Sequence, residues 1–212
     1  MRHVGDKGNS LAKAIFLDRD GVINKKAPGD GYVTRWQDFE LLPDVAEAIS
    51  QINRAGLAVI VITNQRCIAK GLMTVDDLED IHQQMREFLE KRGARIDAIY
   101  YCPHETDPAC HCRKPAPGMF ERASHDYGIQ LTVSWMIGDS DIDIEAGKNA
   151  GCKTALLLGT GAGASVRALN RADLVTSSLQ EAVRLILTYE QSNAGSKVNL
   201  PTALGVSTGA SR

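Results

Sequence analysis

Short apolar runs alternate with helix-like segments along most of this chain, and no other sequence feature restricts the fold as strongly. The runs read as strands buried on both faces and cover 14–17, 57–62, 96–101, 133–137, 154–158 and 174–175. Apolar positions at helical spacing predict helices over 45–54, 75–89, 117–127, the stretch after 139 up to 150, 164–170 and 179–189. This order predicts an α/β fold, a parallel sheet sandwiched by helices.

Length and composition indicate one domain, which we expect to span residues 12–191 of the 212. The ends, 1–11 and 192–212, are expected to be disordered, because they show neither helical nor strand periodicity. A net charge of −2 with mixed signs argues against a nucleic-acid binder. Neither a signal-peptide core nor a bilayer-spanning apolar run is present, so we expect a cytoplasmic protein without membrane contact. We also expect a monomer.

Acidic and polar side chains stand at the carboxyl ends of three predicted strands. They are Asp18 and Asp20, Thr63 and Asn64, and Asp139 and Asp143. Parallel sheets bind ligands at this edge, where gathered carboxylates repel one another unless a cation lies between them. A site with few protein oxygen ligands suits Mg²⁺, which keeps water molecules and takes the oxygens of a substrate phosphate.

Donors and cations near these carboxylates complete the requirements of phosphoryl transfer. Thr63 and Asn64 can donate hydrogen bonds to a phosphoryl oxygen. Lys114 supplies a compact positive charge, and Arg113 supplies a planar fork of donors. Together with a metal ion, these groups can stabilise the charge that develops on a transferred phosphoryl group.

Two of the carboxylates can carry the chemistry itself. Asp18 can attack phosphorus as a nucleophile and form an aspartyl-phosphate. Asp20 has the reach to protonate the leaving oxygen and later to activate water. Each motif alone has a simpler interpretation: Asp-x-Asp-Gly is common in turns and calcium-type loops, and Asp141 can cap the following helix. The common position at strand ends favours the phosphoryl chemistry.

Three cysteines and a histidine fall within residues 102–112, which we expect to form a zinc-binding loop. They are Cys102, His104, Cys110 and Cys112. Three thiolates and an imidazole close a tetrahedral structural Zn²⁺ site, which would hold Arg113 and Lys114 over the phosphate. His111 is an alternative to His104. A disulfide-bearing loop is the alternative to a metal site, although nothing in the sequence indicates an oxidising compartment.

In their order along the chain, these residues resemble the four motifs of the haloacid dehalogenase (HAD) superfamily of phosphohydrolases. The matching motifs are Asp18-x-Asp20, Thr63-Asn64, Lys114 and Asp139-x-x-x-Asp143. The resemblance implies a Rossmann-like fold and Mg²⁺ bound by Asp18, Asp139 and the backbone carbonyl of Asp20, with Asp143 just outside the ligand set. Residues 21–62 and 65–113 are too short for the cap domain of many members, so we expect a capless enzyme.

Within that superfamily, the zinc loop and the motif surroundings resemble the branch of heptose bisphosphate phosphatases and histidinol-phosphate phosphatases. The branch implies substrate contacts from Asp30, Gly31, Tyr32, Thr63, Asn64, Gln65, Arg66, Arg113, Lys114 and Ser140. Departures from its usual pattern occur at Arg66-Cys67, which replaces Ser-Gly, at Ser140, which replaces Lys, and in the longer loop at 25–28. Arg66 either meets a second phosphate or points to solvent.

We therefore expect a Mg²⁺-dependent phosphomonoesterase that acts on a small phosphorylated metabolite, a sugar bisphosphate, through an aspartyl-phosphate. The resemblance favours removal of the 7-phosphate of D-glycero-D-manno-heptose 1,7-bisphosphate, in the synthesis of nucleotide-activated heptose for lipopolysaccharide. Alternatives are a histidinol-phosphate phosphatase of histidine biosynthesis and another small sugar-phosphate phosphatase. An alternative of another class is a zinc-stabilised protein that binds phosphorylated metabolites without catalysis.

Overall fold

A computed structural model of the chain describes residues 13–29, 31–106, 109–159 and 165–193. Six parallel strands form one sheet in the order β3-β2-β1-β4-β5-β6. Their bounds are β1 Ala14–Leu17, β2 Ala58–Asn64, β3 Ala98–Cys102, β4 Trp135–Gly138, β5 Lys153–Leu157 and β6 Leu174–Thr176. Leu17 pairs with Val61 of β2 and Ile137 of β4, so these three strands end at one edge of the sheet.

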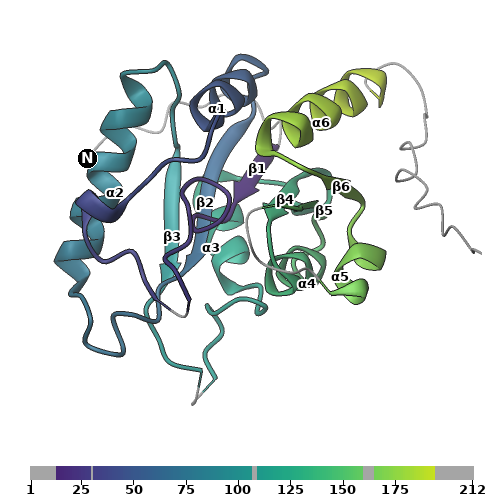
Figure 1. The fold of residues 1–212 in the computed structure, drawn as a ribbon. Coiled ribbons are helices and arrows are strands. Elements are labelled where there is room, and N and C mark those ends of the chain that lie inside the picture. The colour runs from purple at the N-terminus through teal and green to yellow at the C-terminus, as the bar shows by residue number, and fades with distance from the viewer. Residues whose placement is uncertain (1–12, 30, 107–108, 160–164, 194–212) are drawn as a thin grey trace, which may run out of the picture.

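Helices cover both faces of the sheet (Figure 1). They are α1 Val45–Arg54, α2 Val75–Glu90, α3 Gly118–Tyr127, α4 Asp141–Asn149, α5 Val166–Arg171 and α6 Leu179–Asn193, with short 3-10 turns at Trp36–Asp38 and Leu131–Val133. Successive side chains of a strand point to opposite faces. Ile15 and Leu17 therefore pack with α1, α2 and α6, while Ala14 and Phe16 pack in a second cluster with α3 and α4.

Local sequence rules explain most element boundaries. Thr74 caps α2, its hydroxyl accepts from the Asp77 N–H, and Asp77 bonds back to the Thr74 N–H, which confirms the predicted start. The strand predicted from Ile96 begins at Ala98; Ile96 is buried but lies outside the ladder. Val75, the first apolar position of the helix predicted over 75–89, is 45% exposed, because it is the first residue of α2.

The start of α4 differs from the prediction. Ser140, and not Asp141, is the capping residue, and Asp143 completes a reciprocal capping box with it. Asp141 instead lies in the first turn and accepts hydrogen bonds from the backbone and hydroxyl of Ser165. Its carboxylate therefore fastens the start of α5 to α4.

The described residues between the motifs contain no additional domain. The stretch from β1 to β2 holds a 3-10 turn and α1, and the stretch from β2 to β3 holds α2. The predicted disordered ends lie outside the described residues, apart from Ser192 and Asn193 at the end of α6. Among the described helices, none has the length and hydropathy needed to cross a membrane.

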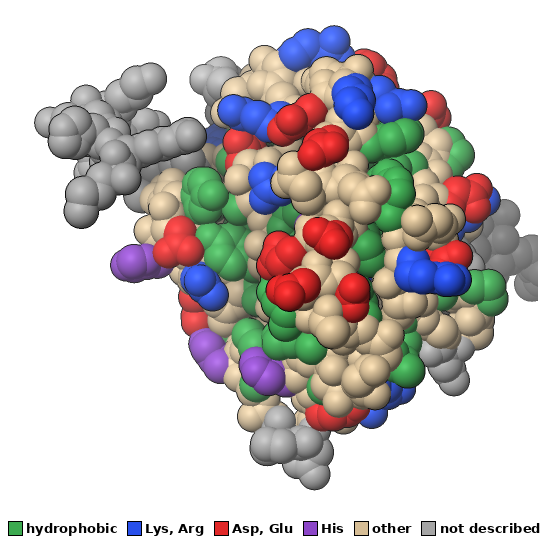
Figure 2. Space-filling view, turned by 90° about the vertical axis from the view of Figure 1, so that its left-hand side faces the viewer, with side chains coloured by type: hydrophobic (Ala, Val, Ile, Leu, Met, Phe, Trp, Pro, Cys, Tyr) green, Lys and Arg blue, Asp and Glu red, His purple; other side chains and the backbone are tan. Residues whose placement is uncertain are grey.

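One face of the molecule is distinctly acidic. Figure 2 looks onto the side that carries α2 and shows Asp and Glu side chains gathered near its centre, with Lys and Arg scattered around them. The exposed side of α2 supplies carboxylates from Asp76, Asp77, Glu79 and Asp80.

Candidate active site

The ends of β1 and β4 bring two acidic side chains to one buried lysine. Asp18 directly follows β1, and its backbone N–H donates to the Ile137 carbonyl of β4 at 3.0 Å. Asp143 lies in the first turn of α4. Lys114 Nζ lies 2.8 Å from Asp18 Oδ1 and 2.6 Å from Asp143 Oδ1, and the lysine is 3% exposed. One positive charge therefore faces two negative charges inside the protein.

A third acid completes this group, which we name the carboxylate cluster (Asp18, Asp139 and Asp143). Asp139 follows β4 and is fully buried. One carboxylate oxygen from each of the three acids lies within 4.8 Å of the other two. Lys26 Nζ lies 2.7 and 2.8 Å from the two oxygens of Asp139. A Cβ at Gly21, where φ is +95°, would lie 2.0 Å from Asp139 Oδ2, so only glycine leaves room for this carboxylate.

Close packing fixes Asp143 in the same way. A Cβ on Gly138, the last residue of β4, would lie 2.1 Å from the Cβ of Asp143. The backbone N–H and hydroxyl of Ser140 both donate to Asp143 Oδ2. Asp143 is thus held from both sides, and its Oδ1 is left to meet Lys114.

The cluster carries more negative charge than Lys114 and Lys26 together balance. Burial raises the pKa of Asp18 to about 7, repulsion by Asp143 adds to this effect, and Lys114 opposes it. Burial also acts to lower the pKa of Lys114, but attraction by Asp143 and Asp18 outweighs it and raises that pKa above its ordinary value. A divalent cation would relieve the repulsion among these hard oxygen ligands, and the donor set fits Mg²⁺.

The end of β2 holds the lysine in place. Asn64 Nδ2 donates to the Lys114 carbonyl at 3.1 Å, and the Lys114 N–H donates to Asn64 Oδ1 at 3.0 Å. Asn64 thus ties the backbone on either side of Lys114 to the sheet. Its predicted contact with a phosphoryl oxygen remains a prediction. Thr63 lies beside it, 1% exposed, and its hydroxyl accepts from Gln65 Nε2 at 2.9 Å.

Asp20 lies at the same edge but its carboxylate is outside the cluster. Its Oδ1 accepts from Arg19 at 3.0 Å and Asn24 at 2.9 Å, and its Oδ2 accepts from Arg19 at 2.9 Å and Gln65 at 3.0 Å. Burial acts to raise the pKa of Asp20, but Arg19 and these hydrogen bonds outweigh it and lower that pKa. Gln65, predicted to contact substrate, is 1% exposed and bridges Asp20 to Thr63.

A second group of ligands, the Cys/His cluster (Cys102, His104, Cys110 and Cys112), lies where β3 ends. Cys102 Sγ and Cys112 Sγ each lie 3.4 Å from Cys110 Sγ. His104 Nδ1 lies 3.2 Å from Cys112 Sγ and 3.6 Å from Cys102 Sγ. A tetrahedron with Zn–S bonds of about 2.3 Å has edges of about 3.8 Å. The spacing is close to that of a four-ligand zinc site.

The two alternatives for this loop do not fit the geometry. All five cysteines are free thiols, and neighbouring sulfur atoms lie much farther apart than the roughly 2 Å of a disulfide. His111 lies outside the group, because its Nε2 pairs with Glu121 at 2.6 Å. Arg113 Nη1 donates to the His104 carbonyl at 3.3 Å. Arg113 is therefore bound to the loop itself, and its predicted contact with substrate stays a prediction.

Other predicted substrate residues surround the site. Arg66 Nε lies 2.5 Å from Glu105 Oε2, and both side chains are about one third exposed. Arg66 therefore does not point freely to solvent, one of the two sequence-based alternatives. Lys70 Nζ lies 5.0 Å from the centroid of the Tyr32 ring. These contacts join the segment after β2 to its neighbours on both sides.

Three further residues were predicted to contact substrate: Ser140, Gly31 and Asp30. Ser140 directs its hydroxyl to Asp143, as the cap of α4. Gly31 is exposed at the surface. Asp30 lies outside the described residues.

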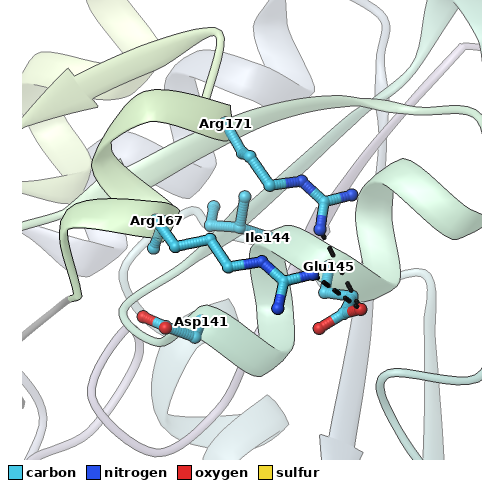
Figure 3. A pocket seen from close by; sticks show the side chains of 6 residues that line it. Asp141, Ile144, Glu145, Arg167 and Arg171 are labelled. Carbon is cyan, nitrogen blue, oxygen red and sulfur yellow. Dashed lines mark ion pairs between the residues drawn. The ribbon is translucent and has the colours of Figure 1, made fainter.

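A separate small cleft lies between α4 and α5 (Figure 3). Arg167 and Arg171 both point toward Glu145, at 3.7 and 3.9 Å. Asp141 and Ile144 line the rest of this cleft. The two guanidinium groups are already directed at a carboxylate, so the cleft does not offer a free site for an anion.

Comparisons with known proteins agree with this architecture. A family model described as HAD-hydrolase-like matches residues 111–182. The D-glycero-beta-D-manno-heptose-1,7-bisphosphate 7-phosphatase of Pseudomonas aeruginosa is 40% identical over 68% of this chain and 79% of its own length. The protein of the same name from Haemophilus ducreyi is 38% identical over 81% of this chain and 96% of its own.

A solved structure gives the same result. The D,D-heptose 1,7-bisphosphate phosphatase of B. bronchiseptica, in complex with magnesium and phosphate, superposes with a TM-score of 0.74 and 33% identity. The match covers 84% of this chain and 99% of that one. The chain belongs to the HAD-like hydrolases, as the sequence motifs predicted. It is a phosphoric monoester hydrolase, which sets aside the alternative of a binding protein without catalysis.

Three residues of the site were missed at the level of sequence. Lys26 was noted only as part of a lengthened loop, yet its ammonium contacts Asp139. Arg19 and Asn24 hold Asp20 and had no assigned role. A polar residue next to an acidic motif gives no indication of the direction of its side chain, so these contacts needed the folded backbone.

Proposed function

We propose that this phosphatase removes the 7-phosphate of D-glycero-beta-D-manno-heptose 1,7-bisphosphate. The chemistry is supported by one observation above the others: three buried carboxylates and a buried lysine converge at the end of the central strand. The choice of substrate is supported by the relatives that carry this printed name. That name also specifies the beta anomer, which the sequence left open.

The proposed mechanism uses the residues of the carboxylate cluster in two steps. Mg²⁺ bound by Asp18, Asp139 and the Asp20 carbonyl would supply positive charge beside the transferred phosphoryl group. Asp18 attacks phosphorus, and the bond to the sugar oxygen breaks as Asp20, which must enter this step in its protonated form, delivers a proton to that oxygen. Asp20 then takes a proton from the water that attacks the aspartyl-phosphate, and phosphate is released. Lys114 holds Asp18 in line and offers its charge to the phosphoryl oxygens.

We also propose that the Cys/His cluster binds a structural Zn²⁺. All four ligand positions are filled by protein side chains, which leaves no position for a reacting group. The metal would fix the loop that leads into Arg113 and Lys114, and so keep that segment at the edge of the site. This role is distinct from the chemistry of the carboxylate cluster.

Phosphate release from a defined set of substrates tests the proposal. The set comprises the beta and alpha heptose 1,7-bisphosphates and histidinol phosphate, each with Mg²⁺ and with EDTA. We expect the beta anomer to react fastest, and only with Mg²⁺. Faster turnover of histidinol phosphate would replace the substrate assignment with the alternative drawn from the sequence.

A matched pair of variants tests the nucleophile. Asp18→Asn is expected to lower kcat by more than about 10³-fold, because the amide cannot form an aspartyl-phosphate. Asp80→Asn makes the same change on the exposed side of α2 and should leave kcat unaltered. Turnover retained by Asp18→Asn would disprove the role of that residue.

A further inference from the structure

Arg19 lies between Asp18 and Asp20 in the sequence, and its guanidinium is almost completely buried. The side chain is 1% exposed. Its Nη2 donates to both oxygens of Asp20, at 2.9 and 3.0 Å. Its Nε has no hydrogen-bond partner among the described residues. A buried charge left without its partner is strongly unfavourable, so burial of Arg19 requires Asp20 at this place.

His82 supports the other side of the guanidinium. It lies on α2, is 2% exposed, and its Nε2 faces Arg19 Nη1 at 3.5 Å. Burial, together with the charge of Arg19, lowers the pKa of His82 to about 3, so the imidazole is neutral and can accept at Nε2. Its Nδ1 has no partner within the described residues. The ring packs against Tyr101, with centroids 5.8 Å apart.

The carboxylate held by Arg19 faces the site. Gln65 Nε2 bonds to both Asp20 Oδ2 and the hydroxyl of Thr63, which places Asp20 next to the predicted phosphoryl-binding residue. The Asp20 side chain keeps 27% of its surface exposed while Arg19 keeps 1%. Rotation of the carboxylate would break its hydrogen bonds to Arg19, Asn24 and Gln65 together. The orientation of Asp20 is therefore fixed from behind.

We propose that Arg19 is a positioning residue for Asp20, and that His82 fixes Arg19 in turn. The proposal rests on the proposed function, in which Asp20 gives a proton to the sugar oxygen as the P–O bond breaks and later takes one from the attacking water. Arg19 touches neither substrate nor phosphate. It keeps the Asp20 carboxyl at the distance and angle that both proton transfers require, since general acid–base catalysis depends on hydrogen-bond reach.

Two substrates of different leaving group separate positioning from mere stability. The sugar oxygen of heptose 1,7-bisphosphate needs a proton as it leaves, whereas the nitrophenolate of p-nitrophenyl phosphate does not. For Arg19→Met we expect kcat on the heptose substrate to fall by about 100-fold, the range of general acid catalysis. On the aryl ester the first turnover, in which nitrophenolate leaves before water attacks the aspartyl-phosphate, should slow by less than about threefold, because the acid is not required for that departure.

Control variants keep the result open to contradiction. Arg122→Met makes the same change at a side chain that is 75% exposed and should alter neither rate. His82→Phe removes the acceptor, keeps a ring, and should lower the heptose rate by about fivefold with little effect on the aryl ester. Should Arg19→Met fail to fold, His82→Phe carries the test.

The outcomes separate this inference from the function on which it rests. Equal losses on the heptose substrate and in the first turnover of the aryl ester would show that Arg19 serves stability alone, and unchanged rates in both would show that Asp20 needs no support from it. Either result overturns the inference and leaves the phosphatase assignment intact. A wild-type protein that releases phosphate from neither ester would overturn the proposed function first.

Discussion

The carboxylate cluster and the Cys/His cluster are both compact groups of metal-type ligands, but the protein holds them in different ways. The first lies at the ends of adjacent strands, and its acids are fixed by a buried lysine, a helix cap and two glycines. In the second, Cys102 ends β3, while His104, Cys110 and Cys112 stand on a loop. Sheet and helices thus build the first site, whereas three of the four ligands of the second stand on a loop.

This difference in support matches the different roles of the two clusters. A rigid set of acids around one internal cation stays arranged for chemistry because the fold itself bears the electrostatic strain. With the proposed Zn²⁺, the loop of the Cys/His cluster would gain its structure from the metal, because such binding contributes folding free energy to a small loop. Perturbing each cluster should therefore give different signatures in activity, stability and metal content.

Removal of the internal cation should give the largest effect. Lys114→Met leaves Asp18 and Asp143 facing each other without compensation, and breaking a buried ion pair costs about 3–5 kcal/mol. We expect that loss in urea unfolding at pH 8, with phosphate release below detection. Lys148→Met, which breaks a pair at the surface, is the matched control. Unchanged unfolding of Lys114→Met would show that the two acids do not repel each other.

Loss of one thiolate should affect the Cys/His cluster and much less the core. Cys110→Ser is expected to lose bound zinc, measured by elemental analysis, and to lower kcat by about 10- to 100-fold as the segment at Arg113 and Lys114 loosens. Its thermal unfolding midpoint should fall less than that of Lys114→Met. Cys152→Ala, at a buried cysteine outside the cluster, should keep its zinc. Full zinc content in Cys110→Ser would refute the ligand set.

The carboxyl group of Asp18 should lower the free energy of unfolding more and more as pH rises. The pKa of Asp18 is raised from 3.8 to about 7, so the folded state prefers the protonated form. Between these values folding takes up a proton, and stability falls as pH rises. In EDTA, Asp18→Asn should therefore be more stable than wild type at pH 8, by on the order of 1–2 kcal/mol. The gain should vanish near pH 4, and a gain that is equal at both pH values would contradict the cause.

The smallest effect is expected at an ion pair between the segment that follows β2 and the loop of the Cys/His cluster. Arg66 follows β2, and Glu105 belongs to the loop of the Cys/His cluster. A partly exposed pair of this kind contributes about 0.2–1 kcal/mol. If Arg66 meets the second phosphate, Glu105→Gln frees it and should lower KM for the bisphosphate by about threefold, while Arg66→Met raises KM. A monophosphate should respond to neither change, and a parallel response would assign the pair to loop structure.

Sequence patterns predicted the arrangement of the fold because burial leaves a periodic trace. Continuous apolar runs gave the parallel strands, and the position of Asp18 and Asp139 after such runs placed both acids at one edge. The same rule brought Thr63 and Asn64 there. Ligand spacing likewise identified the loop at 102–112, since thiolates and imidazoles so close in sequence have few other uses.

Side-chain directions could not be obtained in this way. Arg19 reads as a surface residue next to an acidic motif, and only the folded backbone turns it inward toward Asp20. Asn64 was predicted to contact a phosphoryl oxygen because of its type, and the pattern gave no indication that it also bonds to the backbone of Lys114. Such contacts depend on rotamers and on partners distant in sequence, and neither leaves a local pattern.

The tight packing at Gly21 and Gly138 has a consequence for ion choice. Acids of the carboxylate cluster occupy the space that Cβ atoms would fill at these two positions, so neither Asp139 nor Asp143 can move toward its glycine without moving the backbone there. Mg²⁺ takes oxygens at about 2.0–2.1 Å, and Ca²⁺ needs about 2.3–2.6 Å with more ligands. At the proposed Mg²⁺ site, the backbone of Gly21 would restrain Asp139, one of the proposed ligands, and so favour the smaller ion.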